Sequence, residues 1–365
     1  MNNKVLAKDT RYIILTVLLF LGCVGLWQSL LPWLAEYNYR AGFVANTYRK
    51  FPESIGYLDK AFKYAPWETY YLITQVKNYE EMSRIVDPLP EKVAWLNKAK
   101  SMYNYMLRIN PTNPWYYNGL ASIDLALFNL SQTVEERKKF FEEAGEAYKK
   151  AANIDTKNPL FQMSLAYYYH RSGKIDEAYK LYQKCVKLDD WFVEAYYNMA
   201  EIDLMRNNVE SAIRNFEGMA AADRANYDAE NKRYGEWVKG GNFNNYRAKL
   251  AEIYLSQKNF PKAIEFFKWA AEARPDDPKI WRGLGVSYHQ AGQLEMAIYA
   301  YKQAITFDPE LNDIYKYLGY LYYNVGLFNS SIENLRKYLS VNPGDEKARM
   351  DLGRIIAVSS RFKPN

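Results

Sequence analysis

The sequence contains few of the residues that build metal and disulfide sites. Its 365 residues include two histidines and two cysteines. Zinc and iron sites held by His and Cys take about four such ligands, so a site of this kind is nearly excluded by number. A disulfide is also disfavoured, because Cys23 lies within a long apolar run. We therefore predict no metal and no cofactor.

The sequence also lacks the short motifs of common catalytic sites. There is no G-x-x-x-x-G-K-[ST], no G-x-S-x-G, and no G-x-G-x-x-G between a strand and a helix. The two histidines, His170 and His289, are too far apart in the pattern described below to form a catalytic pair. We predict that the protein is not an enzyme and has no catalytic residues.

Charge of one sign is not concentrated. Lys and Arg total 48 and Asp and Glu total 42, a formal net charge of +6. Nucleic-acid binding needs a clustered basic face, so we predict no nucleic-acid partner. Aromatic residues are abundant at 16%, and 34 of them are tyrosine.

One segment lacks charge altogether. Residues 12–35 form an uncharged run of 24 residues. As a helix rising about 1.5 Å per residue, the run is long enough to cross a bilayer core of about 30 Å. Trp27 and Trp33 near its end are typical of the membrane interface. We predict a tail at 1–11 and a transmembrane helix at 12–35.

The alternative for this segment is a cleaved signal peptide. The run is too long for the apolar part of a signal, and no A-x-A-like cleavage site follows it. Lys4, Lys8 and Arg11 precede the run, whereas Arg40 with Glu36 follows it. The positive-inside rule then places the N-terminus in the cytoplasm and the remainder outside, on a single-pass protein of the cell (inner) membrane.

The remainder of the chain repeats with a period of 34 residues. Three consecutive copies stand in register: Leu250, Ala251, Tyr254, Ala263, Phe267, Ala270, Pro275; Trp281, Leu284, Gly285, Tyr288, Ala297, Tyr301, Ala304, Pro309; and Tyr315, Leu318, Gly319, Tyr322, Gly326, Pro343. This pattern resembles the tetratricopeptide repeat (TPR), in which W-x2-L-G-x2-Y, A-x3-F and a late Pro recur every 34 residues. The resemblance implies an all-α fold, a superhelical solenoid of helix-turn-helix repeats preceded by one transmembrane helix.

The same frame extends over most of the chain. We expect about eight repeats within 36–345, followed by a capping helix and tail at 346–365. Two early repeats are about 11 residues longer, with insertions near 80–95 and 126–141. A third insertion near 227–243 breaks the period, and the pattern leaves open whether it is a binding loop or a neutral spacer.

The family resemblance also nominates a binding surface, because the first helix of each TPR lines a concave face. Carried over position by position, the nominated partner-binding residues are Tyr167, His170, Arg171, Tyr197, Lys279, Arg282, His289, Lys316, Tyr320, Tyr323 and Asn324. Tyr and Arg suit peptide recognition. The alternative is that much of the tyrosine excess packs between helices.

The function that these features favour is a membrane-anchored TPR scaffold or adaptor. It would mediate protein–protein interactions in the assembly of an envelope complex, with one or more protein partners. Aromatic-rich repeats after a membrane helix also resemble the C-terminal repeat region of O-antigen ligase and polymerase-type proteins. That resemblance implies the alternative, an accessory of a polysaccharide-assembly or secretion machine that handles a glycan in the groove.

Overall fold

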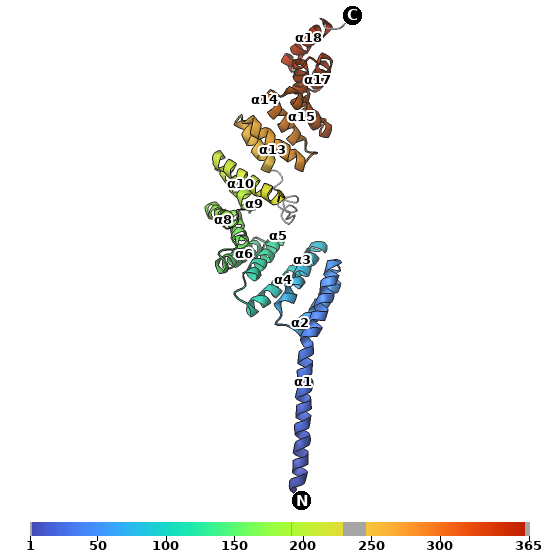
Figure 1. The fold of residues 1–365 in the computed structure, drawn as a ribbon, viewed down its shortest axis with the longest axis vertical. Coiled ribbons are helices and arrows are strands. Elements are labelled where there is room, and N and C mark those ends of the chain that lie inside the picture. Colours follow the sequence, from blue (N-terminus) through green and yellow to red (C-terminus); the bar gives the residue numbers. More distant parts are fainter. Residues whose placement is uncertain (1, 191, 229–245, 362–365) are drawn as a thin grey trace. The chain divides into compact units, whose positions relative to one another are not determined.

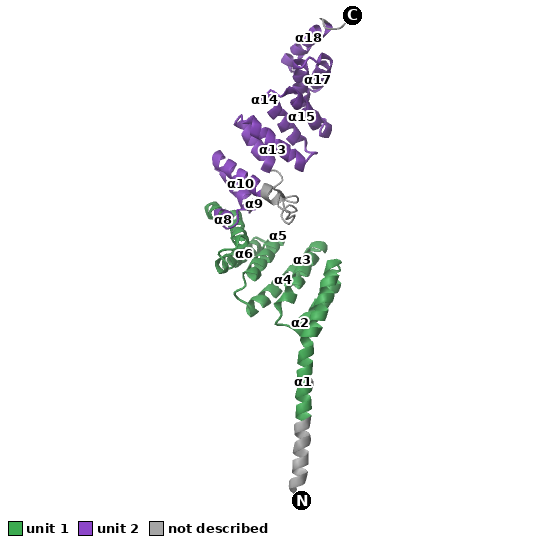
Figure 2. Cartoon of the chain, in the orientation of Figure 1, with its two compact units in different colours: residues 1–181 green, residues 182–365 purple. Residues whose placement is uncertain are grey.

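The computed structural model describes residues 2–190, 192–228 and 246–361. Within these ranges the chain is built of helices joined by short turns, and they contain no strand (Figure 1). The all-α fold expected from the sequence is confirmed. The chain divides into two compact units, residues 1–181 and 182–365, with the boundary inside one helix (Figure 2). Each unit is described by itself.

Unit 1 is a stack of helical hairpins. Its helices are α1 Asn2–Thr47, α2 Phe51–Tyr64, α3 Thr69–Ile85, α4 Leu89–Ile109, α5 Pro114–Leu130, α6 Val134–Ile154, α7 Pro159–Arg171 and the first half of α8 Ile175–Leu188. Consecutive helices pack as pairs, α1 with α2, α3 with α4 and α5 with α6, and each pair also contacts the next. We call the leading member of each pair its first helix and the other its second helix.

The longer repeats of unit 1 consist of longer helices. The first helices α3 and α5 have 17 residues and the second helices α4 and α6 have 21, compared with 13 and 14 in α14 and α15 of unit 2. The differences of four and seven residues account for the extra 11. The residues near 80–95 and 126–141 thus extend the helices by about one and two turns, rather than forming surface loops.

Unit 2 is also built of helical hairpins. These are α9 Val193–Met205, α10 Val209–Asp228, α12 Tyr246–Ser256, α13 Phe260–Ala273, α14 Pro278–Gln290, α15 Leu294–Phe307, α16 Asn312–Asn324, α17 Phe328–Val341 and α18 Glu346–Arg361. The last helix packs on α17 as a single helix. Most of the insertion expected at 227–243 lies outside the described residues.

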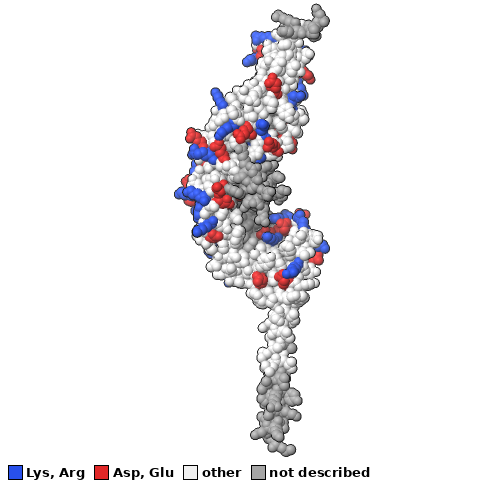
Figure 3. Space-filling model, viewed as in Figure 1, with Lys and Arg blue, Asp and Glu red and all other residues white. Residues whose placement is uncertain are grey.

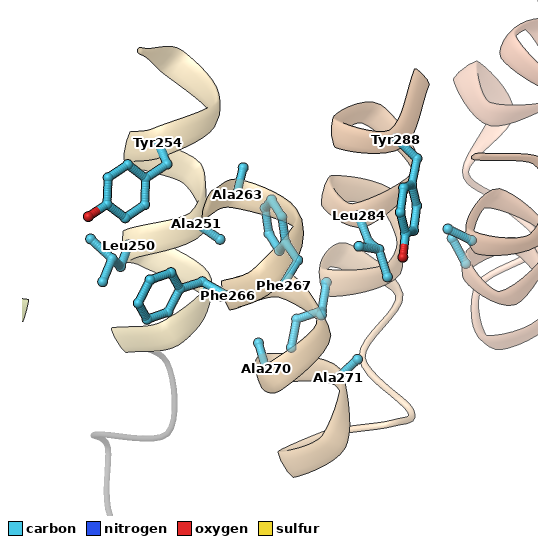
Figure 4. Packing of buried hydrophobic residues seen from close by; sticks show 14 of the residues in the cluster. Leu250, Ala251, Tyr254, Ala263, Phe266, Phe267, Ala270, Ala271, Leu284 and Tyr288 are labelled. Carbon is cyan, nitrogen blue, oxygen red and sulfur yellow. The ribbon is translucent and has the colours of Figure 1, made fainter. Parts of the chain in front are cut away.

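The core of unit 2 is made by the repeat residues themselves. Tyr254 of α12, Phe267 of α13, and Leu284 and Tyr288 of α14 are all at most 4% exposed and belong to one cluster (Figure 4). Alanines at the close contacts, such as Ala270, are fully buried. Large side chains therefore fill the space between helices where small ones allow the backbones to approach.

The end of α1 forms the first helix of a complete repeat. The Ser54 hydroxyl of α2 donates to the Gly42 carbonyl of α1 at 2.7 Å. The Ser331 hydroxyl of α17 makes the same 2.7 Å bond to the Gly319 carbonyl of α16, also 12 residues earlier. The first hairpin thus has the helix contact of a regular repeat, although its sequence matches the pattern poorly.

The preceding part of α1 extends away from the first hairpin (Figure 1). Thr16–Thr47 has the length and composition of a membrane span. Its most apolar 18 residues have a mean hydropathy of 1.8, and none of them is buried against the rest of the chain. Leu19 and Phe20, for example, are 67% and 68% exposed. The length and composition of this segment fit the expected anchor. A signal sequence near the N-terminus has the same two properties.

Candidate functional site

The nominated residues lie on first helices in both units. Tyr167, His170 and Arg171 are on α7 of unit 1, whereas the other eight are on α9, α14 and α16 of unit 2. Local sequence begins several of these helices in the same way. Asn113, Asn158 and Asp277 each accept a hydrogen bond from the backbone amide two residues later, with Pro as the first helical residue.

Arg282 pairs with the next first helix instead of pointing freely into solvent. Its guanidinium donates from Nη2 and Nε to Oδ2 of Asp313, at 2.5 and 3.0 Å. Both side chains are about half exposed. The fork therefore joins α14 to α16 at the surface, where an ion pair adds little stability but does fix the orientation of both groups.

Lys316 makes an equivalent link towards α18. Its ammonium lies 2.6 Å from Oδ2 of Asp345, and the Tyr338 hydroxyl donates to the same oxygen at 3.0 Å. The Lys316 hydrogen bond, followed by the backbone amide of Ala348, lowers the pKa of Asp345 to about 2. The carboxylate is thus held charged at the start of the last helix.

Tyr320 also forms a hydrogen bond to the neighbouring helix. Its hydroxyl donates to Oδ2 of Asp351 in α18 at 3.1 Å. Burial and this hydrogen bond raise the pKa of Tyr320 to about 12. Tyr320, Lys316 and Arg282 therefore connect successive repeats, and a partner that binds them must work with side chains already held in place.

The other unit 2 residues on α14 and α16 differ in exposure. Lys279, Tyr323 and Asn324 are exposed, and the Tyr323 ring lies 5.9 Å from that of Phe328. His289 is half-buried, and burial lowers its pKa, so the ring is neutral at pH 7. Exposure leaves Lys279, Tyr323 and Asn324 accessible to a partner.

Tyr197 belongs to a polar link between α9 and α12. Lys249 of α12 donates to the Tyr197 hydroxyl at 3.3 Å and to Glu201 Oε1 at 2.6 Å. Burial opposes the charge on Lys249, but the hydrogen bond to Glu201 and its charge outweigh it and raise the pKa of Lys249. Tyr197 is thus an orienting group within the repeat stack.

In unit 1 the three nominated residues cluster at the end of α7. The Arg171 guanidinium lies 5.8 Å from the Tyr167 ring centre and 5.2 Å from that of Phe128, both within cation–π range. Tyr167 is 47% exposed. Burial lowers the pKa of the half-buried His170, so it carries no charge at pH 7.

The structure adds three apolar residues that the sequence analysis did not nominate. Tyr70, Trp115 and Leu160 are each the second residue of a first helix in unit 1, and they are 56%, 53% and 47% exposed. We call them the apolar row. They stand 45 residues apart, the period of the longer repeats, which is the signal in the sequence that could have identified them. The Trp115 ring packs edge-on against Phe161, 4.8 Å away.

A cavity of about 460 Å³ lies elsewhere in unit 1, lined by residues of the second helices α4 and α6 and of the first helix α5. At its wall the Lys100 ammonium is 2.6 Å from Asp124 Oδ1 and 2.5 Å from Glu143 Oε2. Burial raises the pKa of Asp124 against the opposing effect of Lys100. Because the Lys100 ammonium bridges both carboxylates and so links α4, α5 and α6, the arrangement indicates a structural cluster.

The described part of the chain offers no metal site. No group of three or more His, Cys, Asp or Glu residues within it is placed to hold an ion. Cys185 is fully buried, and burial raises the pKa of its thiol to about 12, so it acts as a small packing residue.

Comparison with known families identifies the repeats. Residues 161–190 match a family model described as "Tetratricopeptide repeat", and residues 287–326 match one described as "TPR repeat". The chain therefore contains tetratricopeptide repeats, as its sequence pattern predicted. TPR proteins generally mediate protein–protein interactions.

Among curated proteins, the chain is similar to parts of several proteins. It is 24% identical over 231 residues to Superkiller protein 3 of Schizosaccharomyces pombe, covering 61% of this chain and 16% of that protein. It is 30% identical over 98 residues to Small glutamine-rich tetratricopeptide repeat-containing protein 2 of Mycosarcoma maydis, covering 27% and 28%. The Protein CTR9 homolog of Arabidopsis thaliana is 21% identical over 327 residues, covering 79% and 29%. The chain thus spans less than a third of each of these relatives.

Two solved structures of TPR proteins are also similar to parts of this chain. YrrB, described as a TPR protein with an unusual peptide-binding site, is 18% identical with a TM-score of 0.45, covering 57% of this chain and 98% of that one. The C-terminal part of a TPR protein from Cytophaga hutchinsonii is 15% identical with a TM-score of 0.48, covering 78% and 99%.

Proposed function

We propose that this protein is a membrane-anchored TPR scaffold that captures a protein partner on its first helices during assembly of an envelope complex. Residues 12–35 would hold it in the cell (inner) membrane, with the N-terminus in the cytoplasm and the repeats outside. The observation that carries the partner-binding part is the apolar row of Tyr70, Trp115 and Leu160.

The apolar row is only partly covered by the packing of the repeats. The side chains that build the core, such as Leu125 and Phe161, are at most 8% exposed, whereas each member of the row remains about half exposed. Covering apolar surface gains about 25 cal/mol per Å², and aromatic anchors commonly dominate protein interfaces. The row therefore suits a partner segment with apolar side chains.

The row members lie on successive neighbouring helices. The Tyr116 hydroxyl donates to Thr69 Oγ1 at 2.9 Å, which brings the starts of α5 and α3 together. The contact of Trp115 with Phe161 does the same for α5 and α7. Residues at one position of three stacked helices can contact a single extended or helical segment.

In unit 1, the nominated residues supply polar contacts for such a partner. Tyr167 and Arg171 lie on α7, the helix that also carries Leu160. In unit 2, Lys279, Tyr323 and Asn324 are exposed on α14 and α16. These side chains support recognition of a polypeptide, and the alternative of a bound glycan remains a prediction from the sequence.

Capture of partners by the full-length protein in mild detergent tests this function. Replacing Trp115→Ala together with Leu160→Ala should weaken capture by about tenfold or more, which is typical of anchor truncation. The matched control is Val134→Ala, an apolar residue that is 77% exposed but begins the second helix α6. The control should capture normally.

The opposite pattern would contradict the proposal. Loss of capture in Val134→Ala, with Trp115→Ala and Leu160→Ala unaffected, would place the interface on the second helices. Enrichment of glycan without protein would favour the polysaccharide-handling alternative.

A further inference from the structure

We propose that Trp33, Tyr37 and Trp67 form an aromatic collar that seats the first hairpin in the headgroup region of a lipid bilayer. This inference rests on the proposed anchor at 12–35. It goes further, because it makes the turn between α2 and α3 a second contact with the membrane.

The turn between α2 and α3 lies level with the end of the uncharged run. Ala35 of α1 shares a core cluster with Ala61 and Ala65, and all three are at most 3% exposed. The Tyr71 hydroxyl near the start of α3 donates to Glu36 Oε2 at 3.4 Å. The turn at 65–68 therefore stands beside residues 35 and 36 of α1, and Figure 1 shows α2 ending where α1 emerges.

The boundary between membrane and water falls at the same level. After residue 35 the first charged groups are Glu36 and Arg40, which pair at 2.7 Å. The described part of α1 that protrudes from the first hairpin shows no charged side chain on the face in Figure 3. A bilayer that covers the uncharged run would thus end beside Trp67.

The three aromatic side chains are unusually exposed for their size. Trp33, Tyr37 and Trp67 are 64%, 61% and 60% exposed. Trp33 and Tyr37 stack on one side of α1 with ring centres 6.0 Å apart, whereas the neighbouring Ala35 is buried against α2. The collar therefore has members on α1 and on the adjacent turn. Tryptophan and tyrosine concentrate at bilayer interfaces, where the ring is apolar and its N–H or O–H remains wet.

The tryptophan at this turn is not a general feature of the repeat. The residue at the corresponding position, directly after the Pro or its equivalent, is Thr112, Lys157, Asp276, Glu310 or Gly344 in five other turns. A further turn has Trp191, which lies outside the described residues. An exposed tryptophan beside the uncharged run thus needs a local reason, and the bilayer provides one.

A collar of this kind would fix how the repeats stand on the membrane. Polar bonds tie α2 and α3 to α1 in addition to the shared core, since Asn78 of α3 donates to Ser54 of α2 at 2.7 Å and Ser54 donates to Gly42 of α1. With α1 embedded and the turn resting on the headgroups, the hairpin would have two attachments to the bilayer instead of one.

Depth-dependent fluorescence quenching tests the collar in the full-length protein. The protein would be reconstituted in phosphatidylcholine and phosphatidylglycerol vesicles with brominated acyl chains, after Cys23→Ala and Cys185→Ala. An environment-sensitive dye is attached at Lys63→Cys, an exposed site in the last turn of α2. The control is Tyr48→Cys, a 74% exposed site at the opposite end of the hairpin. Counted along the axis of α1, Tyr48 lies about 18 Å beyond Glu36.

We expect quenching at position 63 to exceed that at position 48 several-fold. Adding Trp67→Ser should reduce the quenching at position 63 by at least half, whereas Tyr48→Ser should not change it. Equal quenching at 63 and 48, or no effect of Trp67→Ser, would overturn the collar. A dye at Leu30→Cys separates the two proposals, because absence of quenching there would refute the anchor itself.

Discussion

Lys100, Asp124 and Glu143 form a partly buried cluster of charged side chains in unit 1. The Asp124 side chain is 2% exposed and that of Lys100 is 20% exposed, so both have lost most of their hydration. A buried charge pair adds little net stability, yet removal of one member leaves the other without compensation. The cluster therefore stabilises the packing of α4, α5 and α6 only while all three charged side chains are present.

Replacing Asp124→Ala should lower the free energy of unfolding by about 2 kcal/mol, less than for a fully buried pair because Glu143 still faces Lys100. Urea-induced unfolding followed by circular dichroism measures the change. Glu146→Ala is the control, since Glu146 pairs with Lys149 at an exposed site and should cost at most about 0.5 kcal/mol. Equal effects of the two variants would refute the role of the cluster.

Asp345 predicts a pH dependence of stability. Its pKa of about 2 in the folded protein is below the ordinary value of 3.8. The lowered pKa stabilises the fold fully above about pH 4, and this contribution disappears as the pH falls towards 2. Thermal unfolding should therefore show a difference between the parent protein and Asp345→Asn at pH 5 that shrinks by pH 2. A difference independent of pH would contradict this assignment.

The residue-level pairing could not be predicted from sequence. Repeat positions placed Arg282 and Tyr320 on first helices, but their partners Asp313 and Asp351 are each 31 residues further along. The acidic residue with which Arg282 or Tyr320 pairs depends on how neighbouring helices are rotated about their axes. The repeat pattern does not specify that rotation. The packing role of Cys185 was predictable, because alanine occupies its position in other repeats.

At the scale of the helices, close approach within a repeat depends on small residues. A Cβ atom on Gly285 would lie 2.6 Å from the Tyr301 ring. Tyr301 is 1% exposed and stacks on Tyr317, with ring centres 5.6 Å apart, so it has little room to move. The contact between α14 and α15 thus requires glycine at this position.

Gly285→Ala should destabilise the protein by about 1–3 kcal/mol through overpacking. The matched control is Gly56→Ala in α2, where a Cβ would meet no atom within 4 Å. That change should stabilise by up to about 1 kcal/mol, since alanine is the better helix former. Thermal or urea unfolding measures the change in the free energy of unfolding of each variant. Destabilisation of similar size in both would argue against the proposed contact.

Helix lengths were harder to predict than helix identity. The 34-residue period with its small and large residues placed the hairpins of unit 2, because those residues form its core. The longer repeats showed only that 11 residues were added near 80–95 and 126–141. Amphipathic helices and surface loops have similar polar composition, so the sequence did not distinguish extension of α3 to α6 from insertion of loops.

At the scale of the whole molecule, α1 combines two roles in one helix of 46 residues. Its end packs in the first hairpin, and its preceding part has the composition of a membrane span. The uncharged run was evident from sequence. The sequence also placed the start of the repeats at residue 36, directly after this run. It did not reveal the hydrogen bond from Ser54 to Gly42 that joins this part of α1 to α2.

Membrane fractionation of the full-length protein with alkaline carbonate tests the central claim, a TPR scaffold held by an uncleaved helix. We predict that the protein stays in the membrane pellet with the mass of the whole chain, and that deletion of residues 1–35 moves it to the supernatant. Release of the full-length protein by carbonate, or recovery of a chain shortened at its N-terminus, would contradict the account.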